Sequence, residues 1–534
     1  MKSVPAFTAP TASVASNAEN DLHECEVLLR RAIETVRGAL RGPRARNRLA
    51  DNAANAAELV RSAPVHPALP RKGRAVTRLI GRILITLPVL AVTGFVVLVL
   101  IGLQADFSRD PNGLSFEADR ARQGAIRLEQ LAPAHGFQQG LKLVGVGTVG
   151  SSNQGMSVAL SADGNTAVVG APGPNNADRD RSPFAQPAGA AWVFTRSAGV
   201  WSKRGNKLVG SSSEYGGGLW SQGASVAVSA DGKTAIVGGP SDNRTTGAAW
   251  VFTRSGGVWT QEGDKLVGTY RAGESALPLG QGMSVALSAD GNTAIVGGWR
   301  AEGAWVFTRS SGVWRQQGNK LVGTGAAGSA RQGMSVALSG DGNTAIVGGW
   351  ADNNKTGAAW VFTRNNGVWT QQGKKLVGAG AEGSAYQGTS VALSADGDTA
   401  IVGGPGDNRG GRSVPFGLGT AGAAWVFTRS SGAWRQEGDK LVSKSGARQG
   451  TSVALSADGN SALVGGLSDE GGLGATSVFT RSGGHWTKSK KLVGTGAMTA
   501  SAVALSSDGS IALIGASNET GGVGASWVFA RTGQ

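Results

Sequence analysis

Three tryptophans, Trp220, Trp299 and Trp350, stand outside the repeating pattern that places the other twelve of the chain's 15 Trp. Trp299 and Trp350 directly follow a Gly-Gly pair, and Trp220 precedes the start of a repeat. An exposed indole offers a large, rigid apolar surface with one N–H donor, and such residues are frequent anchors of binding interfaces. We therefore predict a ligand-binding site at these residues. The alternative is that each ring only covers the strands beneath it.

Residues that could support catalysis are few. Only His485 of the four His lies within the repeats, where most other repeats have Val or Ala, which favours a packing role. No Ser-His-Asp triad or pair of neighbouring carboxylates is visible in the sequence. The pattern predicts that the chain is not an enzyme and needs no cofactor.

Basic side chains recur in two places in the repeat. One set of seven Arg is predicted to end the third strands, on the rim that carries a recurring Asp-Gly pair: Arg196, Arg254, Arg309, Arg364, Arg429, Arg481 and Arg531. Such a ring could bind anions, but pairing of each Arg with a nearby Asp, as in Arg309 with Asp290, is the favoured interpretation. A recurring Lys, including Lys265 and Lys320, is predicted to protect outer strands from edge pairing.

The fold that positions these side chains is built from a sequence repeat of about 50 residues. Its Asp-Gly pairs begin at Asp163, Asp231, Asp290, Asp341, Asp396, Asp458 and Asp508. Each unit predicts four short strands; in the third unit these are 284–288, 293–296, a strand through Trp305 and Phe307, and 314–322. Seven such units predict an all-β fold, a seven-bladed β-propeller with four-stranded blades.

The two ends of the repeat region complete each other. The last unit ends after its third strand, whereas residues 137–145, ahead of the first unit, read as a fourth strand. We predict that this N-terminal strand closes the last blade, because closure removes the open edges of a linear array.

The repeat resembles the FG-GAP repeat of integrin α-chain heads and of many bacterial surface proteins, on residues 282–292, 294–298 and 303–307. The resemblance covers residues 137–534 and implies a propeller; kelch repeats are the alternative family with the same architecture. Integrin-type repeats often bind Ca²⁺ between their first and second strands. Here that loop keeps one carboxylate in most units and two only at Asp396 and Asp398, although Ca²⁺ takes six to eight oxygens. No metal site is predicted.

Ahead of the repeats, residues 83–103 are 21 consecutive residues without a charge, long enough to form a transmembrane helix. Basic residues precede this segment, so the positive-inside rule places 1–82 in the cytoplasm and the propeller on the periplasmic or extracellular side of the inner (cell) membrane. Residues 104–136 are predicted to be a stalk. A cleaved signal peptide is the alternative, but 82 preceding residues are too many for one.

The basic tail 1–82, partly helical or disordered, holds 14 Lys or Arg against 7 Asp or Glu and the chain's one Cys, Cys25. Contact with anionic lipid is predicted. No nucleic-acid role is predicted, because the tail has one Phe and no Trp or Tyr.

Together these features predict a single-pass, membrane-anchored binding module of a bacterial envelope. Its ligand, a protein or a glycan, is expected on the rim opposite the Asp-Gly turns, which we call the long-loop rim because the insertions 171–188 and 404–422 fall there. The alternatives are a lectin-like or carbohydrate-active propeller and a scaffold of an envelope complex.

Overall fold

The computed structural model describes eleven ranges of the chain: 137–138, 142–147, 152–173, 189–211, 222–269, 280–408, 421–443, 448–467, 474–494, 502–519 and 522–531. The predicted tail 1–82, membrane segment 83–103 and stalk 104–136 lie outside these ranges. Among the described residues, no helix combines the length and the apolar character that crossing a membrane requires.

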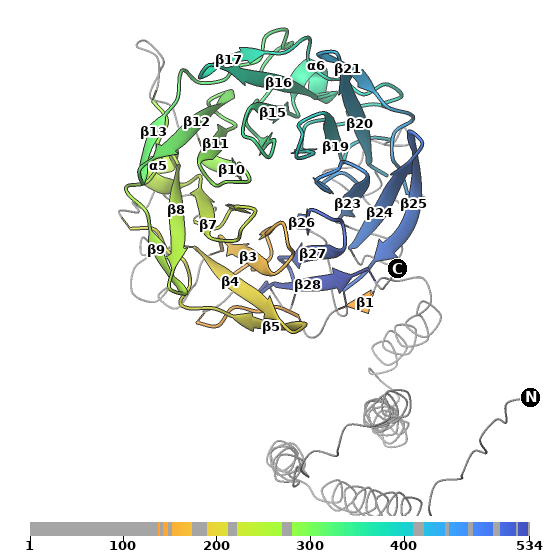
Figure 1. Ribbon diagram of the computed structural model, residues 1–534. Helices are drawn as coiled ribbons and strands as arrows, with labels where there is room; N and C mark the ends of the chain where they lie inside the picture. Colours follow the sequence, from red (N-terminus) through yellow and green to blue (C-terminus); the bar gives the residue numbers. More distant parts are fainter. Residues whose placement is uncertain are drawn as a thin grey trace, which may run out of the picture. The chain divides into compact units, whose positions relative to one another are not determined.

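Seven antiparallel sheets of four strands stand side by side in a ring (Figure 1). Blade 1 is β2 (Ser157–Leu160), β3 (Thr166–Ala171), β4 (Ala190–Ser197) and β5 (Val200–Lys203); blade 2 is β6 (Ser225–Val228), β7 (Thr234–Gly239), β8 (Ala248–Ser255) and β9 (Val258–Gln261); blade 3 is β10 (Gln281–Leu287), β11 (Thr293–Gly298), β12 (Gly303–Ser310) and β13 (Val313–Gln316); blade 4 is β14 (Ser335–Leu338), β15 (Thr344–Gly349), β16 (Ala358–Asn365) and β17 (Val368–Gln371).

The remaining three blades have the same order of strands from the centre outward. Blade 5 is β18 (Ser390–Leu393), β19 (Thr399–Gly404), β20 (Ala423–Ser430) and β21 (Ala433–Gln436); blade 6 is β22 (Ser452–Leu455), β23 (Ser461–Gly466), β24 (Ala475–Ser482) and β25 (His485–Leu492); blade 7 is β26 (Ala502–Leu505), β27 (Ile511–Ala516), β28 (Ala525–Ala530) and β1 (Phe137–Gln138). Two short helices, α5 (Asp242–Thr245) and α6 (Asp352–Lys355), follow β7 and β15.

Strand alternation in each blade divides the core into layers between blades, as predicted. Trp305 and Phe307 of β12 pack against blade 2, in one cluster with Val251. Val306, between them in sequence, lies in the cluster that blade 3 forms with Trp360 of blade 4. Successive side chains of a strand point to opposite faces, and both faces of a blade are covered here. The repeat Trp on the third strands are fully buried.

The fourth strand differs from its prediction. In blade 3 it does not continue to residue 322 but ends at Gln316, and the chain pairs again with β12 only through a bridge between Leu321 and Ala304. Gly318, at a φ of 71°, turns the chain out of the strand. Blade 6 has Lys490 at this position, and its strand β25 continues to Leu492 with a β-bulge in the pairing.

Six of the seven joints between blades have a close fit of glycine and tryptophan. A Cβ on Gly323 of blade 3 would lie 2.0 Å from Cδ1 of Trp360 in blade 4, so only glycine fits. The indole Nε1 of Trp360 donates to the carbonyl of Thr324 at 2.8 Å. At the boundary of blades 5 and 6 the Trp is replaced by Ser477, and the glycine by Ser443. The two positions therefore change together.

The ring is closed, as the sequence predicted. The residue before each Asp-Gly pair donates its backbone N–H to the carbonyl oxygen of the equivalent residue in the next blade, at 2.8–3.0 Å. The last of these bonds runs from Ser507 of blade 7 to Ala162 of blade 1 and closes the circle. At the outer edge, β1 pairs with β28 through Phe137 with Ala530 and Gln138 with Phe529. Figure 1 shows β1 beside β28 at the outer edge of blade 7.

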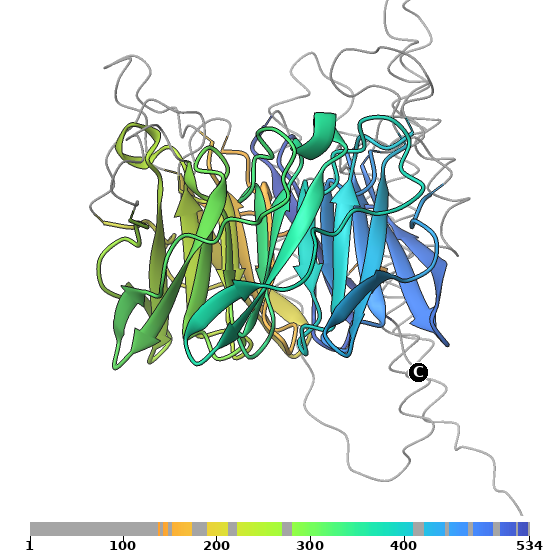
Figure 2. The ribbon, with the colours of Figure 1, turned by 90° about the horizontal axis from the view of Figure 1, so that it is seen from above.

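The two rims differ in their connections. One carries the Asp-Gly turns; the other carries the loops between second and third strands, including α5 and α6. Figure 2 views the ring from the side, with α6 on the upper rim, which is the long-loop rim.

Candidate functional site

Trp299 lies on the long-loop rim because it directly follows β11, the second strand of blade 3. Its ring is half-buried and lies between two guanidinium groups: the Cζ atoms of Arg300 and Arg331 are 4.9 Å and 5.2 Å from the ring centroid. Arg331 comes from the segment that leads into blade 4. The ring therefore spans a blade boundary and holds positive charge on its faces.

Trp350 takes the same place in blade 4. It is half-buried and meets Tyr386 edge to face, with ring centroids 5.4 Å apart and an angle of 69° between the planes. Tyr386 precedes blade 5, as Arg331 precedes blade 4. Two adjacent boundaries on this rim thus carry an aromatic pair and an aromatic–cation group, which we call the aromatic arc (Trp299, Arg331, Trp350 and Tyr386).

The backbone of the aromatic arc is unusual for its residue types. Arg331 and Tyr386 have φ values of 59° and 57°, in the left-handed region that disfavours residues with a Cβ. The equivalent position in blade 3 is Gly280, with φ 63°. Asn153 and Arg448 occupy the same position ahead of blades 1 and 6, with φ values of 55° and 50°, so this conformation belongs to the repeat.

A carboxylate completes the arc. Glu302 accepts a hydrogen bond from the Ser329 hydroxyl at 2.5 Å and another from the Gln332 backbone N–H at 3.1 Å. The segment that carries Arg331 is therefore tied to blade 3 on both sides of the arginine. Of the three predicted site residues, the structure places Trp299 and Trp350 on one rim of adjacent blades, and Trp220 lies outside the described residues. Sequence analysis missed Arg331 and Tyr386, although both directly precede a recurring Gln-Gly pair.

On the opposite rim, the prediction that each Arg pairs with its turn Asp is wrong in detail. Arg309 donates from Nε to the amide oxygen of Asn292 at 2.9 Å and from a terminal nitrogen to Glu262 of the preceding blade at 2.7 Å. Asp290 instead accepts from its own turn, from the Ser288 hydroxyl and the Asn292 N–H. Strand alternation placed Arg309 on the correct rim but could not identify an acceptor in another blade.

The carboxyl group of Asp290 has a pKa below its usual value. Partial burial opposes ionisation of Asp290, but hydrogen bonds from Ser288 and Asn292 and the charge of Arg309 outweigh it and lower the pKa. The pKa values of Asp163, Asp231, Asp341, Asp458 and Asp508 are lowered in the same way, by the equivalent turn hydrogen bonds.

These shifts predict a loss of stability in acid. A carboxyl whose pKa is lower in the folded chain stabilises the fold above its unfolded pKa, about 3.9, and the contribution is lost as the pH falls through the folded pKa. We expect Asp290→Asn to melt below the parent near neutral pH. The difference should shrink as the pH falls through the folded pKa, because the parent carboxyl becomes protonated there. Melting temperatures of both proteins across pH measure this, and a pH-independent difference would contradict it.

The recurring Lys is not an edge guard, contrary to prediction. Lys375 forms an ion pair at 2.5 Å with Asp352, whose side chain is 1% exposed. Lys265 and Lys440 pair likewise with the buried Asp242 and Asp407, at 2.8 Å and 2.7 Å. Blade 3 has no such acid, and its Lys320 donates to the carbonyl of Ala301 at 2.9 Å. Each pair ties the segment that follows a fourth strand to the loop on the long-loop rim.

Two further sequence-based expectations can be compared with the structure. His485 is exposed at the start of β25, so its position is not a packing position.

In blade 5, Asp396 accepts a hydrogen bond from its own turn and Asp398 accepts one from Arg429 at 2.6 Å, so both carboxylates have partners within the protein. Within the described ranges, no three His, Cys, Asp or Glu side chains gather as a metal site would require.

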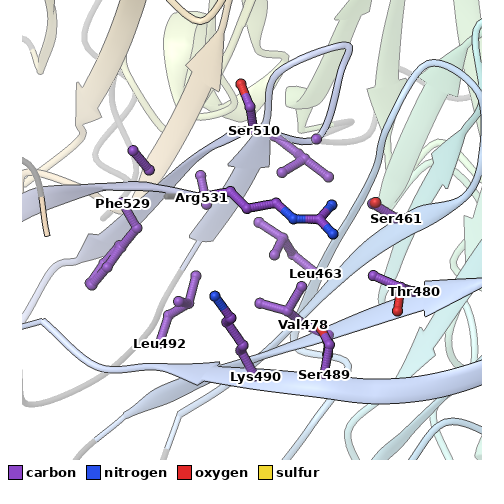
Figure 3. A pocket seen from close by; sticks show the side chains of 14 residues that line it. Ser461, Leu463, Val478, Thr480, Ser489, Lys490, Leu492, Ser510, Phe529 and Arg531 are labelled. Carbon is purple, nitrogen blue, oxygen red and sulfur yellow. The ribbon is translucent and has the colours of Figure 1, made fainter. Parts of the chain in front are cut away.

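A small cleft opens between blades 6 and 7 (Figure 3). Arg531 and Lys490 line it, with the apolar side chains of Leu463 and Val478 between them. Its volume is about 90 Å³, whereas ligand pockets usually measure several hundred Å³. The aromatic arc is therefore the better candidate for a binding surface.

Residues 314–362 match the FG-GAP repeat family. This stretch runs from the fourth strand of blade 3 to the third strand of blade 4, and the same pattern of strands continues around the closed ring. The chain carries an FG-GAP repeat within a seven-bladed β-propeller. A β-propeller that carries an FG-GAP repeat suggests a binding or interaction module. No curated protein matches the chain in sequence.

Solved structures similar to this chain include two proteins provisionally named 6-phosphogluconolactonase and a hydrazine synthase. The protein from Bacteroides uniformis is 13% identical, with 65% of this chain and 86% of that chain covered and a TM-score of 0.44. The one from Bacteroides fragilis is 14% identical, with 64% and 84% covered and a TM-score of 0.42. Kuenenia stuttgartiensis hydrazine synthase is 12% identical, with 74% and 99% covered and a TM-score of 0.43. Likeness at these identities shows the fold alone.

The prediction that the FG-GAP propeller is not an enzyme is corrected by this comparison. Two of the similar structures carry the provisional name 6-phosphogluconolactonase, and one fold can host both enzymes and binding proteins. The missing triad in the sequence excludes one type of chemistry and not enzymes as a class. No reaction is assigned to this chain from identities of 13% and 14%.

Proposed function

We propose that this FG-GAP propeller is the extracytoplasmic, membrane-anchored part of a binding protein that recognises a protein or a glycan through the aromatic arc. The observation that supports the proposal is the arc itself: half-buried aromatic rings and Arg331 lie together on the long-loop rim of adjacent blades. Indole and phenol rings stack on sugar rings or fill protein pockets at little cost in conformational entropy.

Anchoring enters the proposal through residues 83–103, which are long and apolar enough to span a bilayer. The basic tail 1–82 would then lie against anionic lipid on the other side. A fusion of a reporter enzyme to residue 1 or to residue 534 tests this topology, because the two ends are expected on opposite sides of the membrane.

The double variant Trp299→Ala, Trp350→Ala tests the binding surface. Both rings are half-buried, so we expect the ring of blades to stay folded while the contact surface is lost. A glycan array and crosslinking in membranes, each with the full chain, distinguish a glycan from a protein ligand. The expected result is at least a tenfold loss of binding, about 1.4 kcal/mol, in whichever assay the parent gives a signal.

A matched control keeps this test specific. Trp314→Ala removes a half-buried repeat Trp of β13, near the Asp-Gly rim of blade 3, and leaves the aromatic arc intact. Its binding should equal that of the parent. Retention of binding and fold by the double variant would remove the arc from the proposal.

A further inference from the structure

Four blade boundaries on the Asp-Gly rim contain the same hydrogen-bond cluster, which we call the boundary cluster. Between blades 2 and 3, Glu262 at the end of one fourth strand accepts from Arg309 at 2.7 Å and from the indole Nε1 of Trp314 at 3.0 Å. The next three boundaries repeat this cluster. The acceptor is Gln317 for Arg364 and Trp369, Gln372 for Arg429 and Trp434, and Glu437 for Arg481 and Trp486. One side-chain oxygen thus satisfies two donors of the next blade.

The boundary between blades 1 and 2 keeps the donors and lacks the acceptors. The position of Glu262 is taken by Arg204, and the position of Asn292 by Lys233. The described residues offer no hydrogen-bond acceptor to the guanidinium of Arg254, which lies over the Trp259 ring at 5.8 Å. The indole Nε1 of Trp259 is buried without a partner. A buried donor left unpaired costs free energy, so this boundary is incomplete as it stands.

A cavity of about 370 Å³ lies at this boundary. Arg196, Arg204 and Arg254 line it, together with Asp163 and Asp231. Both carboxylates are engaged in their own turns: each accepts from a serine hydroxyl and a backbone N–H. Arg204 is oriented by a hydrogen bond from its Nε to the Thr195 hydroxyl at 2.8 Å. The guanidinium groups therefore meet in a space that supplies positive charge and N–H donors.

We propose that the cavity between blades 1 and 2 is a binding site for a small oxyanion, a phosphate or carboxylate group, whose oxygens replace the missing Glu or Gln side chain. Guanidinium groups match the paired oxygens of such anions and bind them with charge-assisted hydrogen bonds. Arg254 and Arg204 are the charged ligands, and the Trp259 N–H gains a partner. The site lies on the rim opposite the aromatic arc and is independent of the proposed function.

Restoring the repeat residue tests this site. In Arg204→Gln the new amide stands where Gln317 and Gln372 stand, and it can accept from Arg254 and Trp259. We expect titration calorimetry of the full chain with inorganic phosphate, at constant ionic strength set with chloride, to show binding to the parent. Arg204→Gln should bind phosphate at least about tenfold more weakly. Its melting temperature in chloride should equal or exceed that of the parent, because its boundary is complete.

Arg315→Gln is the control, since it removes the same charge from an exposed position of β13. It should bind phosphate like the parent. Equal phosphate binding by the parent and Arg204→Gln, or binding of neither phosphate nor acetate by the parent, overturns the proposal. Acetate in place of phosphate then distinguishes a carboxylate from a phosphate ligand, according to which one the parent binds more tightly.

Discussion

Deletion of residues 137–145 is expected to lower the melting temperature by about 6 °C or more. The segment buries Leu143, which is 5% exposed and bonds through both N–H and C=O to Ser526. The deletion also removes the ion pair of Lys142 with Glu519 and the two hydrogen bonds between the Gly145 backbone and the side chain of the fully buried Gln154. A buried leucine and several orphaned polar groups amount to about 5 kcal/mol or more. For a ring of this size the entropy of unfolding converts that to about 6 °C.

The open blade should also make the protein associate with other copies of itself in solution. Without β1, the edge of β28 presents unpaired backbone groups that can pair with another chain. Scanning calorimetry measures the melt, and light scattering detects association. As a point test, Leu143→Ala should cost about 2–3 kcal/mol, whereas Val146→Ala, at a residue that is 65% exposed, should cost little. An unchanged melt after the deletion would rule out closure by this strand.

Asp352→Ala is expected to destabilise the fold by about 3 kcal/mol. The carboxylate is almost fully buried, and it accepts from Lys375 at 2.5 Å and from the backbone N–H of Ala327 at 2.7 Å. Removing one partner of a buried ion pair leaves the other charge without compensation, which costs about 3–5 kcal/mol. Lys375 keeps 21% of its side chain exposed, so the lower end of that range applies.

Neighbouring lysines give a matched comparison for this prediction. Lys375→Ala removes the paired cation, and Lys374→Ala removes an exposed one from the adjacent position. We expect the first to be destabilising, because Asp352 is left buried and charged, and the second to change stability by less than about 0.5 kcal/mol. Urea unfolding measures both. Similar midpoints for the two variants would show that the pair does not hold the loop to the segment that follows β17.

The architecture could be predicted from the sequence because the repeat determines it locally. Asp-Gly turns, alternating strands and the position of Trp305 depend on residues close in sequence, and the closing strand was found by comparing 137–145 with other fourth strands. Contacts between blades could not be found in this way. The acceptor of Arg309 is Glu262, 47 residues away in another blade, and nothing in the period indicates which side chains meet there.

Some signals were present in the sequence and were not used. An Asp follows the Gly-Gly pair by three residues in the units that carry Asp242, Asp352 and Asp407, and these are the acids that pair with the recurring Lys. Arg204 likewise stands out when the fourth strands are aligned, since four other repeats have Glu or Gln there. Trp299 and Trp350 were identified because they break the pattern, but their partners Arg331 and Tyr386 occupy a variable position.

The stretch that matches the family, 314–362, begins and ends inside blades and crosses one boundary. It therefore contains both halves of one joint: Gly323 and the Trp360 ring that requires it. A gene segment duplicated with these ends carries a complete, self-compatible interface into the new copy. Propellers of this type can thus gain or lose blades during evolution without a mismatched junction, and selection would act on ring size and on the rims.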